Sequence, residues 1–365
     1  MKRLTNQVSL TGSICAEALH IKPVFLSLAT VLLLAARSQC ADYVAIDLGT
    51  LGGSSSQATA VNNAGHIVGS SGTESGGFTP HAFLWTPANG MQDLGTLGGP
   101  LQASAYGINN AGKVVGDAGY AFVWSAKKGT QDLGTLQGGA SAVASGINNA
   151  GRVVGEALFP NTSGGFLSHA FLWTAANGMQ DLGTLGGIFS GATAINDAGS
   201  VVGYSLTPAP VSAHAFLWTA ANGMQDLGTL GGDFCPALAI NNAGWVVGEA
   251  HVGPDFPFRR AFLWTAANGI QDIGTLGGIG AGAGAYGINN AGQVVGWSSA
   301  ESGATSGAIA RHHAVVWTAA NGMQDLGTLG GRESVATGIN EAGLIVGWAH
   351  TASGESHACV WKRVK

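Results

Sequence analysis

The chain of 365 residues contains 60 glycines and 46% apolar residues, with only 15 Lys and Arg against 20 Asp and Glu. The apolar content predicts a folded protein rather than a disordered one, and the many glycines favour β-structure rich in turns. The net charge of -5 and the scattered basic residues exclude the basic surface that binds nucleic acid.

The first 41 residues have the pattern of a secretory signal peptide. Basic residues precede an apolar run from Val24 to Ala36, and small residues follow it. The run is shorter than the roughly 20 residues that a transmembrane helix needs, although an uncleaved anchor is the alternative. We therefore predict residues 1–41 to be the signal and its cleavage region. Residues 42–365 would form one domain that is secreted, periplasmic or at the cell surface, with no transmembrane span after the signal.

Seven copies of one motif follow the predicted signal, at intervals of 39 to 53 residues. Each copy combines Asp-Leu-Gly-Thr-Leu, Ile-Asn-Asn-Ala-Gly, Val-Val-Gly and His-Ala-Phe-Leu-Trp, with small variations. The first motif begins at Asp47, Asp93, Asp132, Asp181, Asp226, Asp272 and Asp325. Such a period is the length of one supersecondary unit that cannot bury its apolar face alone.

The third copy predicts four strands, at residues 142–147, 153–155, 169–174 and 179–185. Asn-Asn-Ala-Gly separates the first two strands, and Ala-Ala-Asn-Gly separates the last two. Both are typical of hairpin turns, because Asn tolerates a left-handed backbone and bonds its own backbone, and Gly adopts positive φ freely. Short links make neighbouring strands antiparallel. The copies differ in length mainly in the segment that connects the second and third strands.

The two ends of the domain complement each other. Residues 43–49 match a fourth strand, and residues 357–361 match a third strand at the other end. We therefore predict an all-β fold, a seven-bladed β-propeller of four-stranded antiparallel blades whose N-terminal strand closes the last blade. An open β-solenoid is the alternative, but its terminal repeats should be atypical, and these are not.

The segments His81 to Trp85, His169 to Trp173 and His214 to Trp218 each lead into Asp-Leu-Gly-Thr-Leu-Gly-Gly. They resemble the HAF repeats of bacterial extracellular proteins, and the resemblance covers residues 42 to 361. It implies secretion and a repeat fold, and it supplies no catalytic residues. The order of elements resembles kelch repeats more weakly, because the double Gly of kelch is missing after the second strand.

The repeated polar residues predict structural roles. A histidine begins the third strand at His81, His169, His214, His313 and His357, with Tyr120 and Arg260 in the other copies. Packed sheets lie about 10 Å apart, so these histidines cannot share one metal ion, and we expect each to donate to neighbouring backbone. The repeated Asp should accept backbone N–H bonds beside Gly.

The repeated tryptophans predict packing between blades rather than a sugar-binding platform. They are Trp85, Trp124, Trp173, Trp218, Trp264, Trp317 and Trp361. Cys235 and Cys359 belong to separate repeats, so we expect no disulfide between them.

Residues that do not repeat gather in the segments between second and third strands, which a propeller places on one face. Aromatic and Arg side chains on a rigid scaffold are typical of recognition surfaces, although exposed insertions are the alternative. We predict a monomeric binding module whose partner is a surface glycan or an extracellular protein. The candidate ligand-binding residues are Phe256, Arg259, Arg260, Arg311 and His312.

The competing hypothesis is a glycan hydrolase or lyase with a site in the central depression. Such an enzyme needs singular carboxylates that converge, and only Asp255 and Glu301 lie in adjacent loops where they could pair. No motif for a cofactor or for a metal site, including calcium loops, is recognisable, so we predict neither.

Overall fold

The computed structural model describes residues 43–74, 79–98, 102–161, 165–208, 211–253, 259–277, 281–300 and 311–364. The chain divides into two units, residues 1–39 and 40–365, and every described residue belongs to the second. The predicted signal region therefore lies outside the described residues. No helix in the described part is long and apolar enough to cross a membrane.

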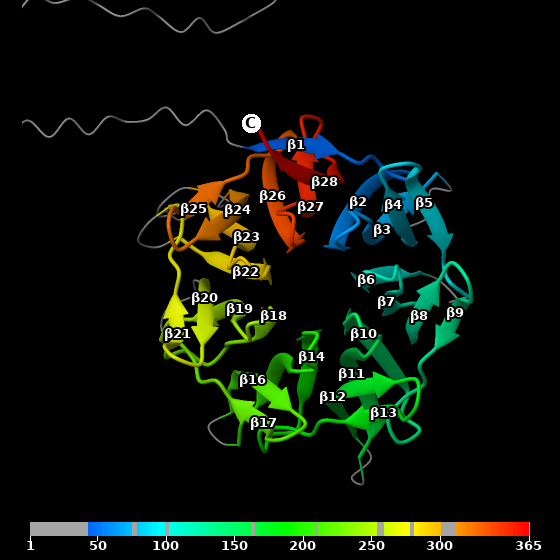
Figure 1. Ribbon diagram of the computed structural model, residues 1–365, viewed down its shortest axis with the longest axis vertical. Helices are drawn as coiled ribbons and strands as arrows, with labels where there is room; N and C mark the ends of the chain where they lie inside the picture. The colour runs from blue at the N-terminus through cyan, green and yellow to red at the C-terminus, as the bar shows by residue number, and fades with distance from the viewer. Residues whose placement is uncertain are drawn as a thin grey trace, which may run out of the picture. The chain divides into compact units, whose positions relative to one another are not determined.

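The described residues form seven four-stranded antiparallel sheets arranged as blades around a central axis (Figure 1). Blade 1 contains β2 (Gly52–Val61), β3 (Ile67–Thr73), β4 (His81–Thr86) and β5 (Gly90–Gly95). Blade 2 contains β6 (Ser104–Ile108), β7 (Val114–Asp117), β8 (Ala121–Ser125) and β9 (Gly129–Asp132). Blade 3 contains β10 (Ser141–Ile147), β11 (Val153–Pro160), β12 (Phe166–Thr174) and β13 (Gly178–Asp181).

The same order continues around the ring. Blade 4 contains β14 (Ser190–Ile195), β15 (Val201–Leu206), β16 (Ala213–Thr219) and β17 (Gly223–Asp226). Blade 5 contains β18 (Ala237–Ile240), β19 (Val246–His251), β20 (Arg259–Thr265) and β21 (Gly269–Asp272). Blade 6 contains β22 (Ala283–Ile288), β23 (Val294–Ser299), β24 (His312–Thr318) and β25 (Gly322–Asp325). Blade 7 contains β26 (Gly330–Ile339), β27 (Ile345–Thr351), β28 (Ser356–Arg363) and β1 (Tyr43–Asp47).

The predicted seven-bladed propeller and its closure are confirmed. Strand β1 pairs antiparallel with β28, with Tyr43 opposite Arg363 and Asp47 opposite Cys359. In each blade the first strand lies nearest the axis and the fourth lies at the rim (Figure 1). The two ends of the described part of the chain thus complete one sheet, and the solenoid alternative is wrong.

The fourth strand is shorter than predicted. In blade 3 it ends at Asp181 rather than at residue 185. Gly183 has a φ of 74° and donates its N–H to the Asp181 carboxylate, which turns the chain out of the sheet. The positive φ supplied by glycine thus ends the strand.

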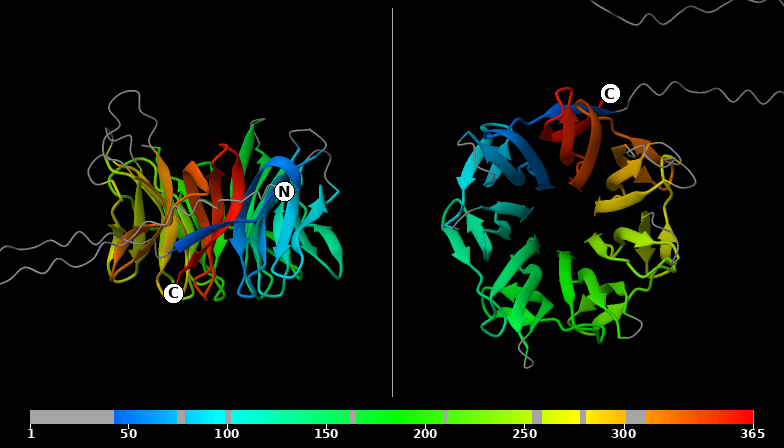
Figure 2. Two further views of the ribbon diagram at one scale, coloured as in Figure 1. Left: turned by 90° about the horizontal axis from the view of Figure 1, so that it is seen from above. Right: turned by 180° about the vertical axis from the view of Figure 1, so that it is seen from behind.

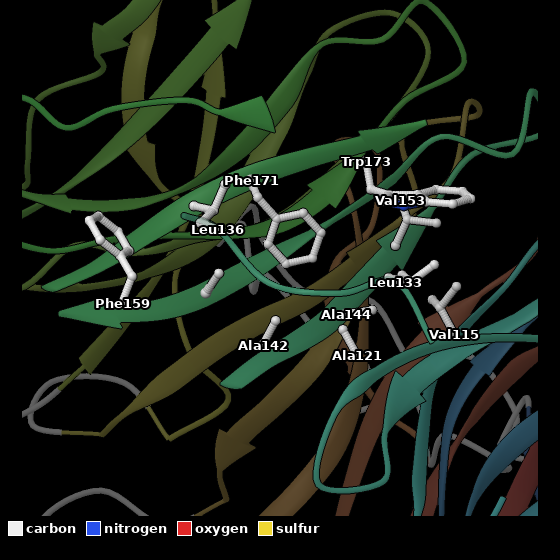
Figure 3. Packing of buried hydrophobic residues seen from close by; sticks show 11 residues of the cluster. Val115, Ala121, Leu133, Leu136, Ala142, Ala144, Val153, Phe159, Phe171 and Trp173 are labelled. Atoms are coloured by element: carbon white, nitrogen blue, oxygen red, sulfur yellow. The ribbon is translucent and has the colours of Figure 1, made fainter. Parts of the chain in front are cut away.

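Seven hydrophobic clusters fill the spaces between neighbouring blades in the described part of the ring. Between blades 2 and 3, Val115 packs with Phe171 and Trp173 (Figure 3). The repeated tryptophans are buried or half-buried in these clusters, so their predicted packing role is confirmed. The phenylalanine at the third position of the His-Ala-Phe motif, or of its Tyr and Arg variants, is 0% exposed in all five copies that carry it, as is Trp361 among the tryptophans.

Cys235 and Cys359 are free thiols, as expected, and both are buried. Burial raises the pKa of the Cys235 thiol to about 12 and also raises the pKa of Cys359. Because the thiolate is the reactive form, both residues act as small core side chains.

Candidate binding sites

The repeated histidines pair with carboxylates, not with backbone as predicted. The Nδ1 atom of His169 lies 2.9 Å from Asp181, twelve residues later on the adjacent strand. The same pair recurs at His81–Asp93, His214–Asp226, His313–Asp325 and His357–Asp47. The cause is the register, which places the start of the third strand beside the end of the fourth.

The repeated Asp also fulfils its predicted role. In all seven copies its carboxylate accepts the N–H of the glycine two residues later, at 2.6 to 2.8 Å. Where the histidine is present, the Asp carboxylate therefore links the third strand to the turn that leaves the blade. These residues belong to the scaffold and not to a site.

The structure places the predicted ligand-binding residues in different parts of the molecule. Phe256 lies outside the described residues, as do Asp255 and Glu301 of the enzyme hypothesis. Arg260 occupies the histidine position of the repeat, and its Nε donates to Asp272 at 2.8 Å, so it serves the scaffold. Arg311 is exposed just before β24, and its carbonyl accepts the N–H of Ala300.

Arg259 lies in a pocket of about 380 Å³ at the boundary of blades 4 and 5. Its lining includes the last residues of β15 and β19 and the first residues of β16 and β20, so the pocket lies at the end of the blades where second strands end and third strands begin. Figure 2 (left) shows the blades of the ring from the side. Its other lining residues are Leu206, Val211, Ser212, Ala213, Asp233, Phe234 and His251. The Arg259 guanidinium lies 5.6 Å from the centre of the Phe234 ring, and Val211 is 67% exposed.

A buried carboxylate holds Arg259 in place. Arg259 Nη1 donates to Glu249 Oε1 at 2.6 Å, and the Glu249 side chain is only 6% exposed. Burial raises the pKa of Glu249, although Arg259 and His251 oppose this shift. No acceptor among the described residues contacts the other N–H groups of Arg259, which is 47% exposed. The guanidinium is thus fixed on one side and available on the other.

His312 belongs to an aromatic group one blade further on. Its ring stacks on Trp297 with the centroids 4.3 Å apart, and Trp297 Nε1 donates to the Tyr286 hydroxyl at 3.0 Å. Burial lowers the pKa of His312, with an opposing effect from Glu333. A Cβ built on Gly284 would meet both Trp297 Nε1 and Glu249 Oε2 within 3 Å, so this group adjoins the Arg259–Glu249 pair. The structure therefore brings Arg259 and His312 to neighbouring positions.

Sequence analysis missed Phe234, Glu249, His251, Tyr286 and Trp297. Glu249 and Trp297 directly follow Val-Val-Gly in the second strand, where the copies differ. The full set at this position is Ser70, Asp117, Glu156, Tyr204, Glu249, Trp297 and Trp348. The residue after Val-Val-Gly varies between the copies, whereas the glycine before it does not. This contrast was the signal in the sequence that could have identified Glu249 and Trp297.

A second variable pair lies between blades 3 and 4. The Tyr204 hydroxyl donates to Glu156 Oε2 at 2.7 Å, and Ser168 donates to Glu156 Oε1. Burial and the Glu156 carboxylate raise the pKa of Tyr204. Both oxygens of Glu156 are therefore occupied, in contrast to Glu249, whose Oε2 is buried without a hydrogen-bond partner.

A third feature lies at the opposite end of the propeller, where the first strands end. A cavity of about 320 Å³ there is lined by the Ile-Asn-Asn segments or their equivalents from all seven blades. We call it the channel mouth. The first Asn of each segment is buried, and its Nδ2 donates to the carbonyl of its counterpart in the next blade at 3.0 to 3.2 Å. The seven bonds form a closed ring.

The second residues of these segments form another closed ring. The backbone N–H of each is accepted by the side chain of the next, at 2.8 to 3.2 Å. The members are Asn63, Asn110, Asn149, Asp197, Asn242, Asn290 and Glu341. The Asn residues thus act through their side chains, and the predicted left-handed backbone is wrong for them, because glycine carries the positive φ in these turns.

Within the described ranges, no group of three or more His, Cys, Asp or Glu residues is placed to hold a metal ion. Neither the comparison with protein-family models nor that with curated proteins gives a match.

Several solved structures are similar to this chain. TolB from Acinetobacter baumannii aligns at 10% identity and a TM-score of 0.44, over 73% of this chain and 62% of TolB. A protein of unknown function from Dyadobacter fermentans aligns at 9% identity and 0.42, over 88% and 100%. AofleA from Arthrobotrys oligospora aligns at 11% identity and 0.38, over 76% and 86%. These likenesses assign no function.

Proposed function

We propose that the protein is a secreted or cell-surface binding module, of the type that carries HAF repeats, which recognises an acidic saccharide of a surface glycan. The observation that carries the proposal is Arg259, whose half-exposed guanidinium lies on Phe234 in a pocket of about 380 Å³. Secretion is supported by the signal-like pattern of residues 1–41.

The chemistry of the pocket matches a sugar that carries a carboxylate. A guanidinium binds a carboxylate through two parallel hydrogen bonds, and the N–H groups of Arg259 that do not face Glu249 provide the donors. The apolar C–H face of a sugar ring packs against aromatic and aliphatic side chains, here Phe234 and Val211. Ser212 and His251 line the same pocket, where the Ser212 hydroxyl contacts His214 Nε2 and His251 Nδ1 contacts Asp233. Their remaining hydrogen-bonding capacity can serve the other sugar hydroxyls.

A glycan array that contains neutral and acidic saccharides tests the proposal with the mature chain, residues 42–365. We expect binding to uronic or other acidic sugars, and at least a tenfold loss of affinity in Arg259→Gln. Arg332→Gln is the matched control, because it removes the same charge from an exposed position on blade 7. Arg259→Lys retains the charge beside Glu249 and should also bind more weakly, since it lacks the planar fork.

Two results would contradict this function. One is an array on which no acidic saccharide binds. The other is an unchanged affinity in both Arg259 variants, each with a melting temperature close to that of the unaltered chain.

A further inference from the structure

The channel mouth offers hydrogen-bond donors and acceptors side by side. The side-chain N–H groups of Asn63 and Asn110 contact no acceptor among the described residues. Blades 4 and 7 carry carboxylates instead. Asp197 Oδ2 accepts from the side chains of Asn149 and Asn242, and Glu341 Oε1 accepts from Asn290. Donors thus gather on blades 1 and 2, and acceptors on blades 4 and 7.

We propose that the channel mouth binds a neutral polyhydroxyl molecule, a single sugar ring or a polyol. Hydroxyl groups both donate and accept, so they match this mixed ring, whereas a simple anion would face the two carboxylates and a simple cation would face the amide N–H groups. The volume of about 320 Å³ accommodates a small ligand, and the lining is dominated by amides and carboxylates.

Asp197 gives the ring of second residues at the channel mouth a negative charge. Burial opposes ionisation of Asp197, but hydrogen bonds from the Asn149 backbone and from the Asn149 and Asn242 side chains outweigh it and lower the pKa. Asp197 is therefore an ionised acceptor at neutral pH, already oriented by its neighbours. Such preorganised acceptors favour a ligand that donates through hydroxyl groups.

An exposed aromatic side chain stands beside the channel mouth. Trp245 follows the Asn-Asn-Ala-Gly turn of blade 5, and its N–H donates to Asn241. Its ring lies over Gly292 in the equivalent turn of blade 6 and remains 39% exposed. The other copies have His66, Lys113, Arg152, Ser200, Gln293 and Leu344 at this position. Trp245 does not line the channel mouth itself, but its exposed ring is available to pack against a further residue of a bound saccharide.

This site is independent of the Arg259 pocket. The channel mouth lies where the first strands end, and the Arg259 pocket lies at the other end of the blades. The ligands also differ, because one site takes a neutral molecule and the other an acidic one. The two proposals therefore fail separately.

The decisive variant is the double substitution Asn63→Asp and Asn110→Asp. It keeps the acceptor oxygens that receive the backbone N–H groups of neighbouring residues, as Asp197 does naturally. It replaces the unpaired amide donors with oxygens. The control is Asn177→Asp with Asn222→Asp, which makes the same chemical change in exposed outer turns.

Saturation-transfer difference NMR with glucose, galactose, cellobiose and sorbitol as probes, supported by titration calorimetry, measures the effect. We expect at least one probe to bind the mature chain, about tenfold weaker binding in the Asn63/Asn110 variant, and unchanged binding in the control and in Arg259→Gln. Binding that survives in the Asn63/Asn110 variant overturns the proposal. So does binding of Ca²⁺ or phosphate at this mouth with no effect from any of the four probes.

Discussion

The glycine of Val-Val-Gly shows how one residue type is dictated by its neighbours. A Cβ built on Gly69 would lie 1.9 Å from the carbonyl oxygen of Gln57 and 2.8 Å from the Phe83 ring. The first strand bulges by one residue at this level in every blade, which brings its carbonyl over the second strand. The bulge and the buried Phe leave room for glycine alone.

Gly69→Ala should therefore destabilise the protein by about 1–3 kcal/mol, the usual cost of overpacking a well-filled core. Gly72→Ala is a control in the same strand, β3, because the nearest atom to its Cβ would be 3.6 Å away. Urea denaturation of the two variants measures the difference. Equal midpoints would show that the close contact in β3 relaxes without cost.

The His–Asp pairs predict how stability depends on pH. Burial by itself would raise the pKa of Asp181, but hydrogen bonds from His169 and from the Gly183 N–H outweigh it and lower the pKa below 3.8. The unfolded chain then binds more protons in this range, so stability is full above about pH 4 and falls as the pH drops through the folded pKa. Asp325 has the same arrangement with His313 and Gly327, and its pKa is likewise lowered.

We expect the urea midpoint to fall as the pH drops below about 4, and to fall less steeply in Asp181→Asn than in the unaltered chain. The substitution removes one group that titrates differently in the two states. If the slopes of the two proteins coincide, the Asp181 carboxylate does not contribute to acid unfolding.

At the scale of single elements, β1 matters most for the stability of the closed ring. It is the rim strand of blade 7, and His357 Nδ1 lies 2.8 Å from Asp47, so the two ends of the domain share the repeated His–Asp pair. Without β1, strand β28 would be an edge with unpaired N–H and C=O groups. The cluster that joins blades 6 and 7 would also lose Tyr43 and Ala45.

Deletion of residues 42–51 should lower the melting temperature by several degrees and promote aggregation. A synthetic peptide of residues 42–51 should restore much of the loss by adding back the missing strand. A deletion that melts like the full mature chain would show that the ring holds without β1.

The sequence predicted the blades and their closure because the repeat marks every turn, and because residues 43–49 match the one strand missing from the last copy. It did not predict the paired amide rings, since Asn-Asn is equally typical of a simple hairpin turn. The contact of Asn62 with Asn109 depends on the curvature of the ring, which no single repeat encodes. Arg259 was named as a candidate from its place in a predicted loop, although it is the first residue of β20, and its partner Glu249 lies within strand β19.

At the scale of the whole molecule, the residues that repeat in every blade and the residues that do not repeat have separate roles. The repeated residues build clusters, turns and hydrogen-bond rings around the full circle. Residues that break the repeat include a group on blades 5 and 6, where Arg259 and Glu249 adjoin Tyr286, Trp297 and His312. A rigid scaffold with such an asymmetric sector is an arrangement suited to recognition.

Hydrogen–deuterium exchange of the mature chain, with and without an acidic oligosaccharide such as oligogalacturonate, tests this division most directly. We predict added protection in residues 211–213 and 232–235, in β19 and in β20, around the Arg259 pocket, with the blades other than 4 and 5 unchanged. Protection spread evenly over the seven blades, or absent from β19 and β20, would contradict the assignment of recognition to this sector.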